Sequence, residues 1–86
     1  MRVLVTGSSG LIGSELVAHF DARARAVVGL DNNMRSDFFG PEGDTRWNLA
    51  HLRQTCKHFT HRELDVRDRA GLVRLVREDG PFELVI

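Results

Sequence analysis

Residues 3–13 read Val-Leu-Val-Thr-Gly-Ser-Ser-Gly-Leu-Ile-Gly, an apolar run that passes directly into three glycines spaced three residues apart. The run is rich in valine and apolar almost throughout, as expected for a parallel strand that helices cover on both faces. After the last glycine, apolar residues recur at helical spacing. The stretch therefore predicts a strand at residues 1–6, a tight glycine turn and a helix at residues 10–22.

The three glycines lie where a bound diphosphate would need them. Gly7 would make the sharp turn, Gly10 would remove a side chain where a phosphate approaches, and Gly13 would let the helix close onto the strands. The N–H groups at the start of a helix and its partial positive charge favour an anion. Because the spacing is Gly-x-x-Gly-x-x-Gly, the strand–turn–helix context carries the prediction of a dinucleotide site. The alternative is a turn that needs glycines only for its shape.

The rest of the chain continues the alternation of strands and helices. Further strands are predicted at residues 26–31, 59–64 and 82–86, and further helices at residues 45–57 and 68–79. This βαβαβαβ order with right-handed crossovers predicts an α/β fold: a parallel, doubly wound sheet of the Rossmann type, with strand order 3-2-1-4. The strand at 59–64 is polar and suits a sheet edge. The apolar last strand would leave the other edge open, so we expect residues 1–86 to be an incomplete N-terminal half of a nucleotide-binding domain, with the rest of that domain and a substrate domain absent.

Helical spacing also predicts which side chains are buried. Thr45 and Asp68 are the expected N-caps of the second and third helices. The residues expected to face inward are Ile12, Leu16, Val17, Phe20, Leu49, Leu52, Cys56, Leu72, Val73 and Val76.

Composition excludes several classes of function. The chain has 86 residues, with 12 Lys plus Arg against 12 Asp plus Glu, and this balance argues against nucleic-acid and anionic-membrane partners. No apolar run approaches the ~20 residues of a membrane span. The single cysteine, Cys56, excludes an internal disulfide and suits a reducing, cytoplasmic location. Cys56, His58 and His61 are close in sequence, but strand alternation sends the two histidines to opposite faces, so no metal site is expected.

Asp31 ends the second predicted strand, 18 residues after Gly13. This separation is close to the ~20 residues at which an acidic side chain meets the adenosine ribose in dinucleotide-binding folds. Its carboxylate would accept hydrogen bonds from the ribose hydroxyls and repel a 2′-phosphate, which favours NAD over NADP. Arg35, four residues on, could favour NADP instead. The alternative for Asp31 is an ordinary solvated aspartate at a strand end.

Asp65 and Val66 follow the third predicted strand at the same edge of the sheet. Asp65 could accept a hydrogen bond from the adenine amino group, while Val66 offers backbone contacts and an apolar surface. The equally weighted alternative is that Asp65 and Asp68 are a turn residue and a helix cap.

Residues 6–13, 31–33 and 65–68 together resemble the N-terminus of an extended short-chain dehydrogenase/reductase of the NAD-dependent epimerase/dehydratase family. Residues 32–35, 38–40 and 43–48 resemble more narrowly the CDP-paratose 2-epimerase branch of that family. The resemblance implies NAD as the cofactor and a nucleotide sugar, here a CDP-sugar, as the substrate. The NAD contacts that it implies are Gly7, Gly10, Leu11, Ile12, Gly13, Asp31, Asn32, Asn33, Met34, Arg35, Ser36, Asp65 and Val66.

Family members act through a Ser/Thr and a Tyr-x-x-x-Lys pair, and bound NAD takes a hydride from the sugar ring and returns it to the other face. This sequence has no tyrosine, and its only lysine is Lys57, so no catalytic residue is assigned and the 86 residues alone are expected to be inactive. Three alternatives stay open. One is another epimerase, dehydratase or reductase of the same family, and another is a non-catalytic NAD(P)-binding regulatory module. The third is a fragment that has no stable fold. Homo-oligomerisation would depend on regions outside this sequence.

Overall fold

Four parallel strands form the sheet of the computed structural model, which describes residues 1–33, 40 and 44–86. The strands are β1 (Arg2–Thr6), β2 (Ala26–Asp31), β3 (Phe59–Glu63) and β4 (Leu84–Val85). Their order, β3-β2-β1-β4, confirms the predicted α/β topology. The polar strand β3 lies at one edge, as its composition predicts. β4 is shorter than predicted, although the backbone N–H of Ile86 still donates to Leu4 O at 2.9 Å.

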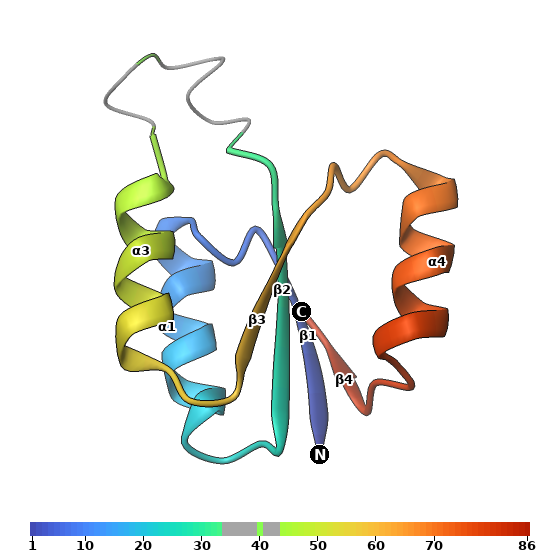
Figure 1. Ribbon diagram of the computed structural model, residues 1–86, viewed down its shortest axis with the longest axis horizontal. Helices are drawn as coiled ribbons and strands as arrows, with labels where there is room; N and C mark the ends of the chain where they lie inside the picture. The colour runs from blue at the N-terminus through green and yellow to red at the C-terminus, as the bar shows by residue number, and fades with distance from the viewer. Residues whose placement is uncertain (34–39, 41–43) are drawn as a thin grey trace.

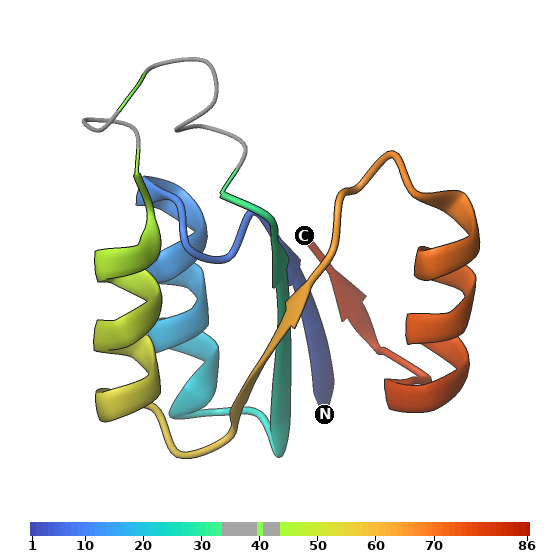
Figure 2. The ribbon, with the colours of Figure 1, turned by 45° about the horizontal axis from the view of Figure 1, so that its top comes forward.

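Helices cover both faces of this sheet (Figures 1 and 2). Helices α1 (Leu11–Asp21) and α3 (Arg46–Thr55) lie side by side on one face, and α4 (Arg69–Asp79) lies on the other. None of the helices among the described residues has the length and apolar character needed to cross a membrane.

The two central strands, β1 and β2, are mostly apolar because their alternate side chains enter two cores. On the α1 and α3 face, the buried residues are Val3, Val5, Val17, Ala24, Val27 and Leu52. On the α4 face they are Leu4, Val28, Leu30 and Leu75. Burial of side chains of this size stabilises a fold by roughly 1.5–3 kcal/mol each. Helices therefore cover both faces of β1 and β2, and the cavities beside these strands lie at their carboxyl ends.

Two predicted helix faces are wrong in part. In α4, Leu75 is 5% exposed, whereas Val73 and Val76 are 44% and 48% exposed. The apolar residues of α4 form two overlapping stripes, and the helix docks by the stripe that contains Leu72 and Leu75. In α1, Ile12 is 74% exposed, because the first turn presents Gly13 rather than a large side chain to the strands.

Both predicted N-cap residues stand at the starts of their helices, but only one of them caps its helix with its side chain. Asp68 caps α4 as expected, since its Oδ1 accepts from the N–H of Gly71 at 3.0 Å. Thr45 precedes α3, but its side chain makes no capping bond. Thr45 is the N-cap residue by position, since its carbonyl oxygen accepts from the N–H of Leu49 at 3.2 Å, while its hydroxyl donates to Asn33 Oδ1 at 2.9 Å.

Candidate functional site

The glycine turn joins β1 to α1 at the carboxyl edge of the sheet. Gly7 has a φ of +64°, a left-handed conformation that glycine adopts without strain. Its N–H donates to Leu30 O at 2.8 Å, which ties the turn to the end of β2. The N–H of Gly10 donates back to Gly7 O at 3.0 Å and closes the turn.

The third glycine allows the helix to approach the turn closely. A Cβ atom at Gly13 would lie 2.0 Å from Gly7 O and 2.7 Å from Gly7 C, so no side chain fits there. A Cβ at Gly10 would lie 3.2 Å from the same oxygen, a tight contact. The close packing expected from the spacing of these glycines is thus present in the structure.

Three backbone donors are left open at the start of α1. The first bond of the helix runs from Ser14 N to Gly10 O at 2.9 Å. Gly10, the N-cap, has no side chain, and no described residue accepts from the N–H groups of Leu11, Ile12 and Gly13. These three residues line a cavity of about 460 Å³ together with Thr6, Gly7, Gly10, Leu16 and Ile86. An anion in this cavity would meet unpaired donors and the positive end of the helix.

Asp31 connects the end of β2 to the glycine turn. Its Oδ2 accepts from the N–H of Ser9 and its Oδ1 from the N–H of Asn33, both at 3.0 Å. A carboxylate offers about four lone-pair directions, so Asp31 can accept further hydrogen bonds. It lines a second cavity of about 250 Å³ with Ser9, Asn32, Asn33, Thr45, Arg46, Leu49, His61 and Glu63.

Asn33 joins this second cavity to the start of α3. Its Oδ1 accepts from the N–H of Thr45 at 2.8 Å, and its Nδ2 donates to Asp44 Oδ1 at 3.1 Å. Asp44 also accepts from the guanidinium and the N–H of Arg46, and these bonds lower the pKa of Asp44 to about 2. The Asp44 carboxylate is therefore ionised at neutral pH. The backbone of Asn33 has a φ of 58°, which lies in the left-handed region.

Asp65 and Val66 lie at the same edge of the sheet but form a separate group. The Asp65 carboxylate accepts from the N–H of Arg67 at 2.8 Å and pairs with its guanidinium at 2.7 Å, and these bonds lower the pKa of Asp65. Val66 is exposed. Among the described residues, no hydrogen bond joins Asp65 to Asp31 or to the glycine turn. Both of these bonds go to Arg67, two residues along the chain, as expected if Asp65 is a turn residue.

Three residues near the site had no predicted role there. Asn48 Nδ2 donates to Ser9 O at 2.9 Å, a contact between segments 39 residues apart that no local pattern indicates. His61 Nε2 lies 2.8 Å from Glu63 Oε2, and the His61 side chain is only 5% exposed. In the sequence, His61 suggests only a metal ligand, and the described residues contain no group of three metal-ligating side chains. Met34, Arg35 and Ser36 lie outside the described residues.

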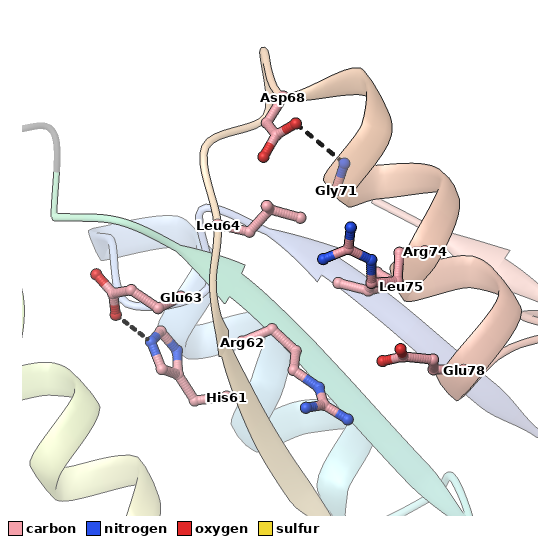
Figure 3. A pocket seen from close by; sticks show the side chains of 9 residues that line it. All are labelled: His61, Arg62, Glu63, Leu64, Asp68, Gly71, Arg74, Leu75 and Glu78. Carbon is pink, nitrogen blue, oxygen red and sulfur yellow. Dashed lines mark hydrogen bonds and ion pairs between the residues drawn. The ribbon is translucent and has the colours of Figure 1, made fainter.

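A further cavity, of about 360 Å³, lies between β3 and α4 (Figure 3). It is lined by charged side chains of both signs, among them Arg62, Arg74 and Glu78. His61 and Glu63 project to the side of β3 away from α4 in this view. The cavity contains neither the glycine turn nor Asp31, and Asp68 in its wall is occupied as the cap of α4.

Comparison with known proteins gives a family and a similar structure. A family model described as the NAD dependent epimerase/dehydratase family matches residues 3–86. The chain is also similar to a mutant of UDP-glucuronic acid 4-epimerase from Bacillus cereus, whose crystal structure is a complex with UDP-4-deoxy-4-fluoro-glucuronic acid and NAD. The two are 27% identical with a TM-score of 0.71, and the match covers 99% of this chain and 25% of that chain.

The present chain thus spans about a quarter of the length of that epimerase. The family model, by contrast, covers almost all of the 86 residues, from the first residues of β1 through β4. The matched residues include the glycine turn and Asp31. The chain belongs to the NAD dependent epimerase/dehydratase family.

Proposed function

We propose that the chain binds NAD at the carboxyl edge of its sheet, with the diphosphate against the N–H groups of Leu11, Ile12 and Gly13. The observation that carries the proposal is this set of donors, which have no acceptor among the described residues and stand at the N-terminus of α1. Two linked phosphates need such donors and the positive end of a helix dipole. Gly7 and Gly10 use their own N–H groups within the protein, so we assign them other roles: Gly7 makes the turn, and Gly10 keeps a side chain away from the approaching phosphate.

For the adenosine half of NAD, we propose the cavity beside Asp31. The Asp31 carboxylate can accept from the ribose hydroxyls while it holds Ser9 and Asn33, and its charge disfavours a 2′-phosphate. Asn32 and Asn33 line the same cavity. Contacts from Met34, Arg35 and Ser36, and an adenine contact from Asp65 and Val66, are proposals that rest on the family resemblance.

The function proposed for the longer protein is that of a nucleotide-sugar epimerase. NAD, when bound, supplies a hydride acceptor that is regenerated when the hydride is returned to the sugar. The residues of this chain bind and orient the cofactor; the sequence contains no tyrosine to act as the family's base. We propose that residues 1–86 form part of the NAD-binding domain, and that the rest of that domain and the substrate-binding residues belong to the remainder of the protein.

The finer proposal is that the substrate is a CDP-sugar and the reaction a 2-epimerisation, as in CDP-paratose 2-epimerase. Its support is the sequence resemblance at residues 32–35, 38–40 and 43–48. The similar structure holds a UDP-sugar. The complete protein, assayed with CDP-paratose and with UDP-glucuronic acid, separates the two: turnover of the UDP-sugar alone would contradict the finer proposal and leave the family function intact.

Calorimetric titration of the complete protein with NAD and with NADP tests the binding proposal. We expect saturable binding of NAD and weaker binding of NADP. Equal affinity for the two would contradict the role of Asp31, and an absence of NAD binding would contradict the proposal as a whole.

A further inference from the structure

The backbone of Ser9 is held from two directions. Its N–H donates to Asp31 Oδ2 at 3.0 Å, and its carbonyl oxygen accepts from Asn48 Nδ2 at 2.9 Å. Ser9 is only 2% exposed, and its own hydroxyl has no partner among the described residues. The position of Ser9 therefore depends on these backbone bonds rather than on its side chain.

The Asn48 bond acts on the peptide plane that leads into α1. The carbonyl of Ser9 and the N–H of Gly10 belong to one rigid, planar unit. The Gly10 end of this plane donates to Gly7 O at 3.0 Å, and the Ser9 end accepts from Asn48. The next N–H along the chain is that of Leu11, the first of the three open donors. Glycine leaves this plane free to rotate, since Gly10 has no Cβ to restrict it, so the two bonds at its ends determine its orientation.

Asn48 reaches the turn from α3, a helix that contributes no open donor to the cavity in front of Leu11 and Ile12. Asn48 is partly buried, and a buried carbonyl that loses its donor costs about 1–3 kcal/mol. The Asn33 bonds to Thr45 anchor the beginning of the same helix at the site. Helix α3 is thus bonded to the carboxyl edge of the sheet at two points: Thr45 bonds to Asn33 beside Asp31, and Asn48 bonds to Ser9 in the glycine turn.

We propose that Asn48 is a positioning residue of the dinucleotide site. Its amide fixes the Ser9–Gly10 peptide and thereby aims the N–H groups of Leu11 and Ile12 at the diphosphate. This inference rests on the proposed NAD function, and it adds a residue from α3 that acts through the turn rather than by contact with the cofactor.

Two substitutions at Asn48 test the inference by calorimetric titration with NAD. Asn48→Leu removes the donor at similar volume and should weaken NAD binding about tenfold. Asn48→Asp places a carboxylate against Ser9 O at neutral pH and should weaken binding at least as much. Once protonated, the introduced carboxyl can donate to that oxygen. The ratio of its Kd to that of the unsubstituted chain should therefore fall as the pH is lowered from about 8 to about 5.

Gln54→Leu is the matched control, because it replaces an exposed carboxamide on the same helix and should leave the Kd unchanged. Circular dichroism and thermal melts of every variant separate binding from folding. If Asn48→Leu lowers the melting temperature but leaves the Kd for NAD unchanged, the inference is overturned while the proposed NAD function stands. A weakened Asn48→Asp variant whose Kd ratio does not fall at lower pH would also overturn it. All of these titrations use the complete protein, and if the unsubstituted protein does not bind NAD, both proposals fail.

Discussion

Asp31 Oδ2 accepts a hydrogen bond from the backbone N–H of Ser9 at 3.0 Å, across 22 residues of sequence. The bond is possible because β1 and β2 are parallel neighbours, paired from Arg2 with Ala26 to Thr6 with Leu30, so that their carboxyl ends meet. The acidic residue proposed for the ribose is therefore also a structural support of the turn proposed for the diphosphate. One hydrogen bond thus joins the part of the site proposed for the ribose to the part proposed for the diphosphate.

This link makes Asp31→Ala a severe change for binding. We expect the affinity for NAD to fall by roughly ten- to a hundredfold, since hydrogen bonds to a charged acceptor are worth about 1.5–3 kcal/mol. The affinity for NADP should fall less, because the charge that repels a 2′-phosphate is removed. Calorimetry with both nucleotides measures this. Glu15→Ala, which removes an exposed carboxylate from α1, is the control and should change neither affinity. An unchanged Kd for NAD in Asp31→Ala would count against the ribose role.

Gly13→Ala should damage the fold as well as the site. The new Cβ would lie 2.0 Å from Gly7 O, and backbone atoms on both sides leave no flexible side chain to move away. We expect a loss of about 3 kcal/mol in the free energy of unfolding, at the upper end for an overpacked site. Urea denaturation followed by circular dichroism measures it. Ser14→Ala, the next residue of the same helix, should stay within about 0.5 kcal/mol of the unsubstituted chain, and an equally small effect of Gly13→Ala would contradict the close approach.

The Asp44 carboxylate should make the stability of the fold depend on pH in the acid range. Its pKa is lowered from 3.8 to about 2, chiefly by the hydrogen bond from the Arg46 side chain. A group whose folded pKa is depressed stabilises the fold above its unfolded pKa, so this contribution is present above about 3.8 and is lost as the pH falls towards about 2. An NMR titration of the Asp44 carboxyl carbon should give the low value. In Arg46→Gln the pKa should rise towards 3.8; no rise in that variant would show that Arg46 is not the cause.

The topology could be predicted from the sequence because its signals are local. The apolar strand followed by glycines, the bounds of β2 and the cap at Asp68 each depend on neighbouring residues. Strand order then follows from the handedness of the crossovers. The inward face of α4 is harder to predict. In the sequence alone, Val73 and Val76 form as good an apolar stripe as Leu72 and Leu75. The choice between them is made by docking against the sheet.

The candidate site could be predicted only where it depends on local chain geometry. The glycine turn and Asp31 have a characteristic spacing, and the structure brings them together. The bonds from Asn48 to Ser9 and from Thr45 to Asn33 connect segments far apart in the sequence, so no pattern indicates them. Thr45 is an example: its position as the N-cap of α3 is predictable from its residue type, but the bonds of its N–H and hydroxyl to Asn33 Oδ1 are not.

The 86-residue chain itself should show no epimerase activity. It has no tyrosine and a single lysine, Lys57, so the acid–base pair of the family cannot be assembled from it. Incubation with NAD and a CDP- or UDP-sugar, followed by chromatography of the sugar, should return only the starting epimer. Formation of the second epimer by the purified chain would show that another base in this sequence performs the proton transfer.

The open N–H groups at the start of α1 are proposed to hold the diphosphate of NAD. A ¹H–¹⁵N NMR titration of the complete protein with NAD observes each of these backbone amides separately. We expect the amide signals of Leu11, Ile12 and Gly13 to move downfield and saturate together, while that of Gly80, at the C-terminal end of α4, stays in place. Saturable NAD binding that leaves the signals of Leu11, Ile12 and Gly13 unmoved would contradict it.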